Sequence, residues 1–397
     1  MATVSIVKRL KPTEFEQVRQ MVKEAIDLLG GPKQFINQGD TVLIKPCLLL
    51  PLDPERAVTT HPLVLQSVVD VIKCETKAGR VLVGDIPRLK LRARDVMKAT
   101  GIEDAAKKAG AEVVYMDEEE QVEVAVPNGV VLDKTKLPKT VLEVDKIIYV
   151  PKLKTHYITK ISCAIKAAHG LQSTDERAKY HREDLHHKLV DLLRVVKPSL
   201  CVVDALVAME GQGPVYGDPV ELNTIVAGDD PVAVDAVCAY MLGFDPLDIP
   251  TTRIAYSDGL GEADLRNIVI KGVEIGRVRR PIRKCDHNIE GVHPKIETFV
   301  GGTCVGCLTS SRGFIDGIIK RGWIDELEKI TIITGMDIHF GHEPTGEIIF
   351  VLGDCAKAYG NKGIFIPGCI PFDSWTLGFE ILEKYLKEKR AKRLDGP

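Results

Sequence analysis

Thr41-Val42-Leu43-Ile44-Lys45, the segment from Pro62 to Ala78, and Arg80-Val81-Leu82-Val83-Gly84 decide the fold class of this chain. The two outer runs are short and apolar, which predicts buried strands. The segment between them has helical apolar spacing and starts with proline. A strand–helix–strand order of this kind is typical of a mostly parallel sheet covered by helices. We therefore expect an α/β fold.

The same alternation continues to about Gly272 and predicts one large, mostly parallel sheet flanked by helices. The further strands expected are Glu112 to Tyr115, Lys146 to Val150, Ser199 to Asp204 and Thr224 to Ala227. The further helices expected are Glu14 to Leu29, Val96 to Ala109 and Pro231 to Met241.

The basic segment from Arg277 to Lys284 resembles a linker, and it separates a domain at 1–276 from a second domain at 285–397. The second segment predicts a smaller, Rossmann-like α/β domain. Its expected helices are Gly306 to Gly322 and Ser374 to Lys389, and its expected strands are Lys329 to Thr334, Glu347 to Leu352 and Gly363 to Ile366.

The composition is that of an ordinary globular protein with two or three domains. The chain has 397 residues, of which 45% are hydrophobic and 27% charged, with a formal net charge of -3. This balance does not favour a nucleic-acid-binding protein. We find no secretory signal and no apolar run of the roughly 20 residues that a membrane helix needs, so we expect a cytoplasmic protein that does not bind membranes.

Ten cysteines are too few for a disulfide scaffold in a chain of this length, so their spacing decides their meaning. Cys74, Cys163, Cys201 and Cys238 lie in or beside apolar patterns. Free cysteine in such a place behaves as a small buried hydrophobe, which is the role we expect for these four.

Cys304, Cys307, Cys355 and Cys369 form a different set. Cys304 and Cys307 make a Cys-x-x-Cys pair before a predicted helix, and Cys355 and Cys369 each follow a predicted strand. Strand ends and helix starts meet at one edge of a parallel sheet, where four thiolates would suit a [4Fe-4S] cluster. A zinc ion, or thiols that are inert or redox-active, are the alternatives.

A group of lysines predicts an anion site in the first domain. In an extended chain after Val150, the side chains of Lys152, Lys154 and His156 point to one face. Lys45 and Lys166 are natural additions, and the alternative is a solvated charged edge. The Thr59-Thr60-His61-Pro62 stretch resembles a helix start, where anions are also attracted, so Thr60 joins the anion-binding candidates.

Acidic residues recur at expected strand ends, at Asp85 and Asp204, and these two are the better candidates for a function. We expect Asp230 to be the N-cap before Pro231. His156 and His61 can titrate near neutral pH and are candidate proton-transfer groups, together with Asp204 as a catalytic candidate.

At these residues the sequence resembles the family catalogued as domain of unknown function 362, whose members are sometimes joined to iron–sulfur modules. The resemblance spans about Lys45 to Gly261 and rests on the motifs around Lys45, Thr59 to Pro62, Val150 to His156, Lys166 to Gly170, Gly211 to Gly217 and Asp230 to Asp235. It implies an α/β fold and a link to anaerobic redox metabolism, but no reaction.

The chain departs from the family pattern at two positions. Cys47 and Ala167 stand where the family usually has asparagine, which puts the identity of any ligand in doubt. Cys47 is either a reactive thiol or a packed one. In the tail, the segments around Cys355 and Cys369 are similar to the cluster-binding segments of Rossmann-like iron–sulfur subunits, with Ile370 where proline is often found.

These observations favour an iron–sulfur oxidoreductase that acts on a small carboxylate or phosphate at the domain interface. A non-redox iron–sulfur lyase or hydratase is the second hypothesis, and an electron carrier or cluster-delivery protein is the third. The first hypothesis leaves room for a redox partner protein and for a homodimer.

Overall fold

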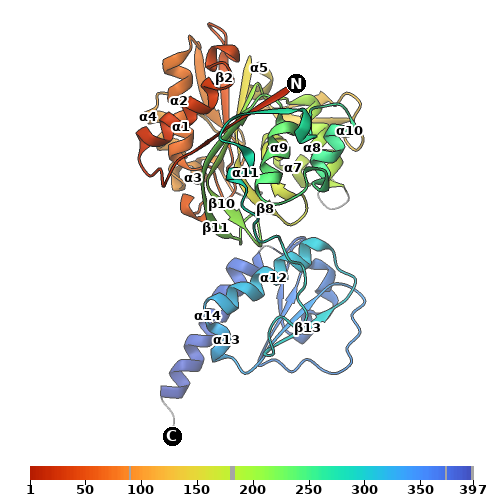
Figure 1. Cartoon of the computed structure of the whole chain (residues 1–397). Helices are drawn as coiled ribbons and strands as arrows, with labels where there is room; N and C mark the ends of the chain where they lie inside the picture. Colours follow the sequence, from red (N-terminus) through yellow and green to blue (C-terminus); the bar gives the residue numbers. More distant parts are fainter. Residues whose placement is uncertain (89–90, 179–183, 372, 395–397) are drawn as a thin grey trace. The chain divides into compact units, whose positions relative to one another are not determined.

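The computed structural model describes residues 1–88, 91–178, 184–371 and 373–394. The chain divides into two compact units, Met1–Lys284 and Cys285–Pro397 (Figure 1). The basic segment that resembled a linker packs on the first unit, where the backbone N–H of Ile282 donates to Leu242 O at 3.1 Å.

Within the described residues, the first unit contains a ten-stranded sheet with the path β12-β1-β11-β10-β7-β2-β3-β4, and β8 pairs with both β10 and β9. Its strands are β1 (Ala2–Lys8), β2 (Thr41–Pro46), β3 (Arg80–Gly84), β4 (Glu112–Val114), β7 (Lys146–Val150), β8 (Lys152–His156), β9 (Lys160–Ser162), β10 (Leu200–Glu210), β11 (Asp218–Gly228) and β12 (Ile268–Gly272). A separate hairpin joins β5 (Gln121–Ala125) to β6 (Lys134–Pro138).

The sheet is mostly parallel, as the sequence predicts. Strands β4, β3, β2, β7 and β10 run parallel to one another, as do β1 with β12 and β8 with β10. Only β11, which lies between β1 and β10, and β9, beside β8, are paired antiparallel within the described part of this sheet.

Helices cover both faces of this sheet (Figure 1). The helices are α1 (Phe15–Asp27), α2 (Pro62–Glu75), α3 (Ala93–Ala99), α4 (Ile102–Lys108), α5 (Lys139–Glu143), α6 (Ala164–Ala167), α7 (Thr174–Ala178), α8 (Leu185–Val195), α9 (Pro231–Met241), α10 (Pro250–Ser257) and α11 (Ile275–Val278). Along β2, Val42 and Ile44 pack with α1 and α2, whereas Leu43 packs with the core that contains α8 and α9. This alternation shows that β2 is buried on both faces, which is why its sequence is a continuous apolar run.

The second unit contains a four-stranded parallel sheet with the order β13-β14-β15-β16 in the part that the structure describes. Its elements are β13 (Ile296–Val300), α12 (Val305–Lys320), α13 (Trp323–Glu326), β14 (Ile330–Thr334), β15 (Ile348–Leu352), β16 (Ile364–Ile366) and α14 (Asp373–Leu394). Phe314 of α12 packs on Phe350 of β15 and on Phe379 of α14, with ring centroids 5.1 Å and 5.0 Å apart. The predicted α/β class is thus confirmed for this chain.

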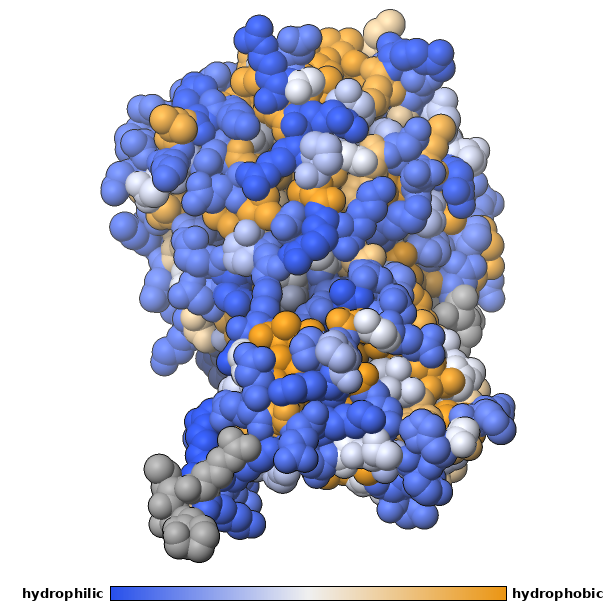
Figure 2. All heavy atoms as spheres, turned by 60° about the horizontal axis from the view of Figure 1, so that its bottom comes forward, coloured by the Kyte–Doolittle hydropathy of each residue, from blue (hydrophilic) through white to orange (hydrophobic). Residues whose placement is uncertain are grey.

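Polar and charged residues cover much of the face shown in Figure 2, with apolar residues exposed in patches between them. No helix in the described ranges is both long enough and apolar enough to cross a membrane. Cys163, Cys201 and Cys238 are buried as expected, but Cys74 is exposed. The prediction for Cys74 was wrong because this cysteine lies on the exposed face of α2, near the end of the helix.

Candidate functional site

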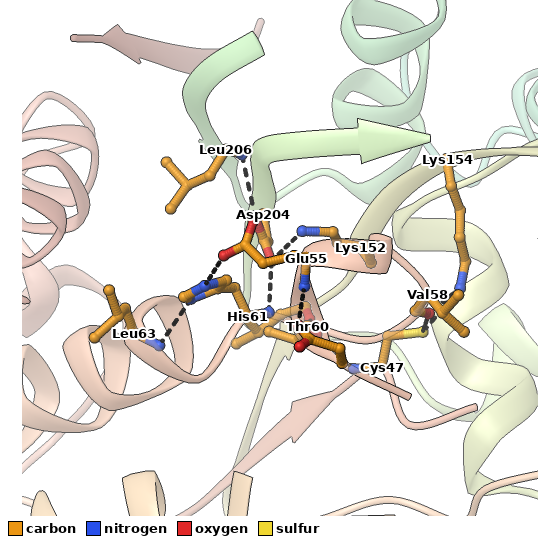
Figure 3. A network of polar contacts seen from close by, with 12 residues as sticks. Cys47, Glu55, Val58, Thr60, His61, Leu63, Lys152, Lys154, Asp204 and Leu206 are labelled. Atoms are coloured by element: carbon orange, nitrogen blue, oxygen red, sulfur yellow. Dashed lines mark hydrogen bonds and ion pairs between the residues drawn. The ribbon is translucent and has the colours of Figure 1, made fainter. Parts of the chain in front are cut away.

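A fully buried ion pair links two neighbouring strands of the first unit. Lys152 Nζ lies 2.9 Å from Asp204 Oδ2, and neither side chain is exposed (Figure 3). The pairing follows from the parallel register, which places Lys152 opposite Asp204. The same carboxylate also accepts the backbone N–H of His61 at 2.7 Å and that of Leu206 at 3.2 Å.

Asp204 does not lie at a strand end, contrary to the expectation from the sequence. Strand β10 continues to Glu210 and shifts register between Ala205 and Val207, so Asp204 lies within the strand. The carboxylate therefore occupies the point where β10 leaves β7 and begins to pair with β8.

A second buried pair lies at the end of β2. Lys45 Nζ is 2.9 Å from Asp85 Oδ1, and Asp85 Oδ2 accepts the backbone N–H of Leu48 at 2.8 Å. Burial raises the pKa of Asp85, and the positive charge of Lys45 opposes this effect. A Cβ atom at Gly170 would lie 2.2 Å from Asp85 Oδ1, so the close approach of this backbone requires glycine.

Arg177 of α7 is a buried cation that the sequence analysis missed. Its guanidinium donates to the carbonyl oxygens of Ile86 and Pro87 and, at 2.8 Å, to that of Gly170. Burial lowers the pKa of Arg177 to about 10, although the charge of Asp85 acts in the opposite direction. Its local sequence is an ordinary helix, so only the fold brings Arg177 into the cluster.

Lys154 has no carboxylate partner in the described part of the chain. Its Nζ donates to Val58 O and lies 3.5 Å from Cys47 Sγ (Figure 3). Burial lowers the pKa of Lys154, and the charges of Lys152 and Lys45 lower it further. Lys152 and Lys154 are each 1% exposed, which excludes the solvated edge that was the alternative for them.

Lys166 of α6 is the least compensated cation of this group. The residue is partly exposed, and its side chain has neither a hydrogen-bond partner nor an ion-pair partner among the described residues. Burial, followed by the charge of Lys154, lowers the pKa of Lys166 to about 7. We call Lys45, Lys152, Lys154, Lys166 and Arg177 the cation cluster; two carboxylates, Asp85 and Asp204, are paired within it.

Two further site candidates, Thr60 and His61, make hydrogen bonds to backbone groups. Thr60 is buried, and its hydroxyl donates to Val150 O and accepts the N–H of Cys47, so its hydrogen bonds lie within the protein. His61 caps α2 through Nδ1, and its Nε2 lies 3.3 Å from Glu55 Oε1 beside a pocket of about 170 Å³.

His156, like His61, has a local structural role. Its Nδ1 accepts the backbone N–H groups of Ile158 and Thr159 at 3.1 Å and 3.2 Å, and its ring stacks on Tyr157. These contacts hold the turn between β8 and β9.

Four of the five cysteines of the second unit, Cys304, Cys307, Cys355 and Cys369, follow the carboxyl ends of its strands, and those ends lie in register. Val300 pairs with Thr334, Thr334 with Leu352, and Leu352 with Ile366. Asp354 N–H donates to Gly368 O at 3.1 Å, and Gly368 N–H donates to Asp354 Oδ1 at 2.8 Å. These two bonds tie the segment that carries Cys355 to the segment that carries Cys369.

Cys304 and Cys307 lie close together at the start of α12. A hydrogen bond with Cys304, together with burial and the charges of Cys304 and Cys355, raises the pKa of the Cys307 thiol. A Cβ atom at Gly353 would lie 3.3 Å from Cys307 Sγ, so glycine leaves the sulfur next to bare backbone. In the described ranges, however, no group of three or more histidine, cysteine, aspartate or glutamate side chains is arranged to hold a metal ion.

Comparisons with known proteins agree with the resemblance seen in the sequence. Residues 42–240 match the family model described as domain of unknown function (DUF362). The chain is 28% identical to the thylakoid-associated protein sll1697 of Synechocystis sp. (strain ATCC 27184 / PCC 6803 / Kazusa), over 66% of this chain and 84% of that protein.

Among solved structures, the chain is similar to the lactate racemase apoprotein from Thermoanaerobacterium thermosaccharolyticum, with 12% identity and a TM-score of 0.41. That likeness covers 61% of this chain and 57% of the racemase chain, and at such a score it carries no inference. The family match includes β2, β3, β7, β8, β10 and most of α9, and therefore the whole cation cluster. The chain belongs to the family described as domain of unknown function (DUF362).

Proposed function

We propose that this protein is an iron–sulfur oxidoreductase that binds a small carboxylate- or phosphate-bearing substrate at the cation cluster. The observation that supports the substrate class most directly is the excess of cations over carboxylates. Lys45 and Lys152 have acidic partners, whereas Lys154 and Lys166 have none in the described part of the chain.

Uncompensated charge of this kind is costly to keep away from water. An anionic ligand lowers that cost, because charge-assisted hydrogen bonds to carboxylate or phosphate oxygens are strong. Lys166 is the cation best placed to meet such a ligand, since it is partly exposed whereas Lys45, Lys152 and Lys154 are buried. A lysine with a pKa of about 7 also exchanges a proton readily at neutral pH, which suits a general acid or base.

The proposed cofactor is a [4Fe-4S] cluster on Cys304, Cys307, Cys355 and Cys369. The donor set fits, because four thiols are the usual ligands of such a cluster and glycines lie beside them. When bound, the cluster would supply one-electron transfer. The described positions of the thiols do not form a ready metal site, so this part of the proposal rests on donor chemistry and on the tied cysteine segments.

Anaerobic purification tests the cofactor. We expect a brown protein with about four irons and four sulfides per chain. Changing Cys304, Cys307, Cys355 or Cys369 to serine should degrade the cluster spectrum, while Cys201→Ala and Cys238→Ala should leave it intact. Stoichiometric zinc in a colourless protein would contradict the cofactor.

Phosphate binding to the full chain, measured by titration calorimetry, tests the substrate class. Lys154→Ala should weaken phosphate binding by about 1.5 to 3 kcal/mol, the scale of a hydrogen bond to a charged group. Lys197 is exposed, so Lys197→Ala is the matched control and should bind phosphate as the wild type does. Equal affinities for the two variants would remove the cation cluster as the binding site.

A further inference from the structure

Cys47 lies within the cation cluster, and the proposed function does not use it. This free, half-buried cysteine follows β2, and its backbone N–H donates to Thr60 Oγ1 at 2.8 Å. Its Sγ lies 3.5 Å from Lys154 Nζ and 3.8 Å from Val58 O. Figure 3 shows the sulfur and the lysine nitrogen both directed at the carbonyl of Val58. The thiol is therefore held in a fixed position against the amino group of Lys154.

Two other cations lie near Cys47, and neither forms an ion pair among the described residues. Lys166 interacts electrostatically with Cys47 and has no partner in the described part of the chain. Arg177 also interacts electrostatically with Cys47. Its side chain is 8% exposed, and its buried Nε has no hydrogen-bond partner among the described residues. Cations without an ion-pair partner favour negatively charged ligands.

We propose that Cys47 is a nucleophile that adds reversibly to the carbonyl carbon of an anionic aldehyde or ketone held by Lys154, Lys166 and Arg177. This inference rests on the proposed function, because it assumes that the cation cluster binds the carboxylate or phosphate of that substrate. It narrows the substrate class from small anions in general to anions that carry an electrophilic carbonyl.

The step is balanced without an outside oxidant. The thiol proton of Cys47 passes to the amine form of Lys154, and the sulfur lone pair forms a bond to the carbonyl carbon. The π bond of the carbonyl breaks toward its oxygen, which takes a proton from the ammonium form of Lys166. The product is a hemithioacetal or hemithioketal, and the reverse sequence of transfers releases the substrate.

Alkylation of the anaerobically purified full chain tests this inference with two probes that differ in charge. Iodoacetate is an anion and iodoacetamide is neutral, and each forms a sulfur–carbon bond while iodide leaves. Peptide mapping by mass spectrometry gives the rate at each cysteine. We expect Cys47 to react with iodoacetate about tenfold faster than with iodoacetamide, the effect of one charge-assisted contact.

Cys74 is the internal control, because it is exposed and its Sγ lies 3.7 Å from the carboxylate oxygen of Asp70. It should prefer the neutral reagent. If Cys47 shows the same preference as Cys74, the inference is overturned, and this comparison needs no substitution.

Two variants separate the roles of the lysines. Lys154→Met should slow alkylation of Cys47 by both reagents, because it removes the charge next to the sulfur. Lys166→Met should slow the reaction with iodoacetate and leave that with iodoacetamide unchanged. An unchanged iodoacetate preference in both variants would contradict the assignment.

Phosphate titration of Cys47→Ala distinguishes failure of this inference from failure of the proposed function. If phosphate binds to this variant and Cys47 of the wild type has no preference for iodoacetate, the proposed anion site is supported and the proposed role of Cys47 as a nucleophile is rejected. If the wild type does not bind phosphate, both the proposed substrate site and the proposed role of Cys47 are rejected.

Discussion

Replacing Lys166 with methionine should make the first unit more stable and less able to bind an anion. Lys166 has its pKa lowered from 10.5 to about 7, mainly by burial. The unfolded chain therefore binds more protons than the folded chain between these pH values, so the stability of the wild type rises as the pH rises from 7 toward 10.5. Methionine keeps the length of the side chain and removes the titration.

The size of this pH dependence follows from the pKa shift of Lys166. Between pH 7 and pH 9 this pKa shift corresponds to about 2 kcal/mol of unfolding free energy, which is an upper figure because Lys166 is partly exposed. Lys166→Met should lose this pH dependence and should exceed the wild type in stability at pH 7. Lys197→Met, at an exposed lysine of the same unit, should retain the slope of the wild type.

The assay must follow the first unit specifically. Both tryptophans, Trp323 and Trp375, belong to the second unit, so intrinsic tryptophan fluorescence would report the wrong part of the chain. Pulse proteolysis in urea, with the protected fragments identified by mass spectrometry, follows Met1–Lys284. Adding phosphate should then stabilise the wild type and not Lys166→Met. Equal slopes between pH 7 and pH 9 in the variant and the wild type would refute the reasoning.

Three further substitutions test the surroundings of the cation cluster, each by the same urea assay. Gly170→Ala places a Cβ atom 2.2 Å from Asp85 Oδ1 and should destabilise the first unit by about 2 kcal/mol or more. Gly276→Ala is the control and should have little effect, because nothing lies within 4 Å of a Cβ atom there. Equal effects of the two substitutions would argue against the close approach at Gly170. Lys152→Met removes the partner of a buried carboxylate and should cost about 3 to 5 kcal/mol; a loss below about 1 kcal/mol would show that the pair contributes little. Burial raises the pKa of Asp235 to about 7, so the wild type should lose about 2 kcal/mol of stability as the pH rises from 5 to 7, and Asp235→Asn should remove that slope; a slope that persists would assign it to another group.

The elements with strong local patterns were predictable from the sequence. The helix expected at Pro62 to Ala78 is observed as Pro62–Glu75, because proline fixes its first turn and apolar residues recur along its length. The strand expected at Thr41 to Lys45 is observed as Thr41–Pro46. Both elements are recognisable because their own residues provide most of the signal.

The long antiparallel pair was less predictable. Strands β10 and β11 each have 11 residues, but only the segments Ser199 to Asp204 and Thr224 to Ala227 were expected. A buried aspartate within a strand resembles a strand end, because nothing in its neighbourhood reveals the lysine that neutralises it. That lysine, Lys152, is 52 residues away in the sequence.

Contacts between residues that are distant in the sequence also limit prediction of the site. Lys45, Lys152, Lys154 and Lys166, which the sequence motifs grouped as anion-site candidates, lie near one another in the structure. Arg177 was missed because its contacts are carbonyl oxygens of Ile86, Pro87 and Gly170, which any sequence provides. Side chains that bind backbone groups leave no signature in the residue pattern.

The position of β1 in the sheet has a consequence for synthesis of the chain. Val4 pairs with Gly228 and Ala2 with Ile268, so both neighbours of β1 are made more than 200 residues later. At about 5 to 20 residues per second, the ribosome needs roughly 10 to 45 s to produce β11 after β1. Strands β2, β3, β4 and β7 can pair with one another during this interval, while β1 waits as an unpaired apolar segment. We therefore expect β1 to be the part of the nascent first unit that most needs protection by a chaperone until translation has passed Ile268.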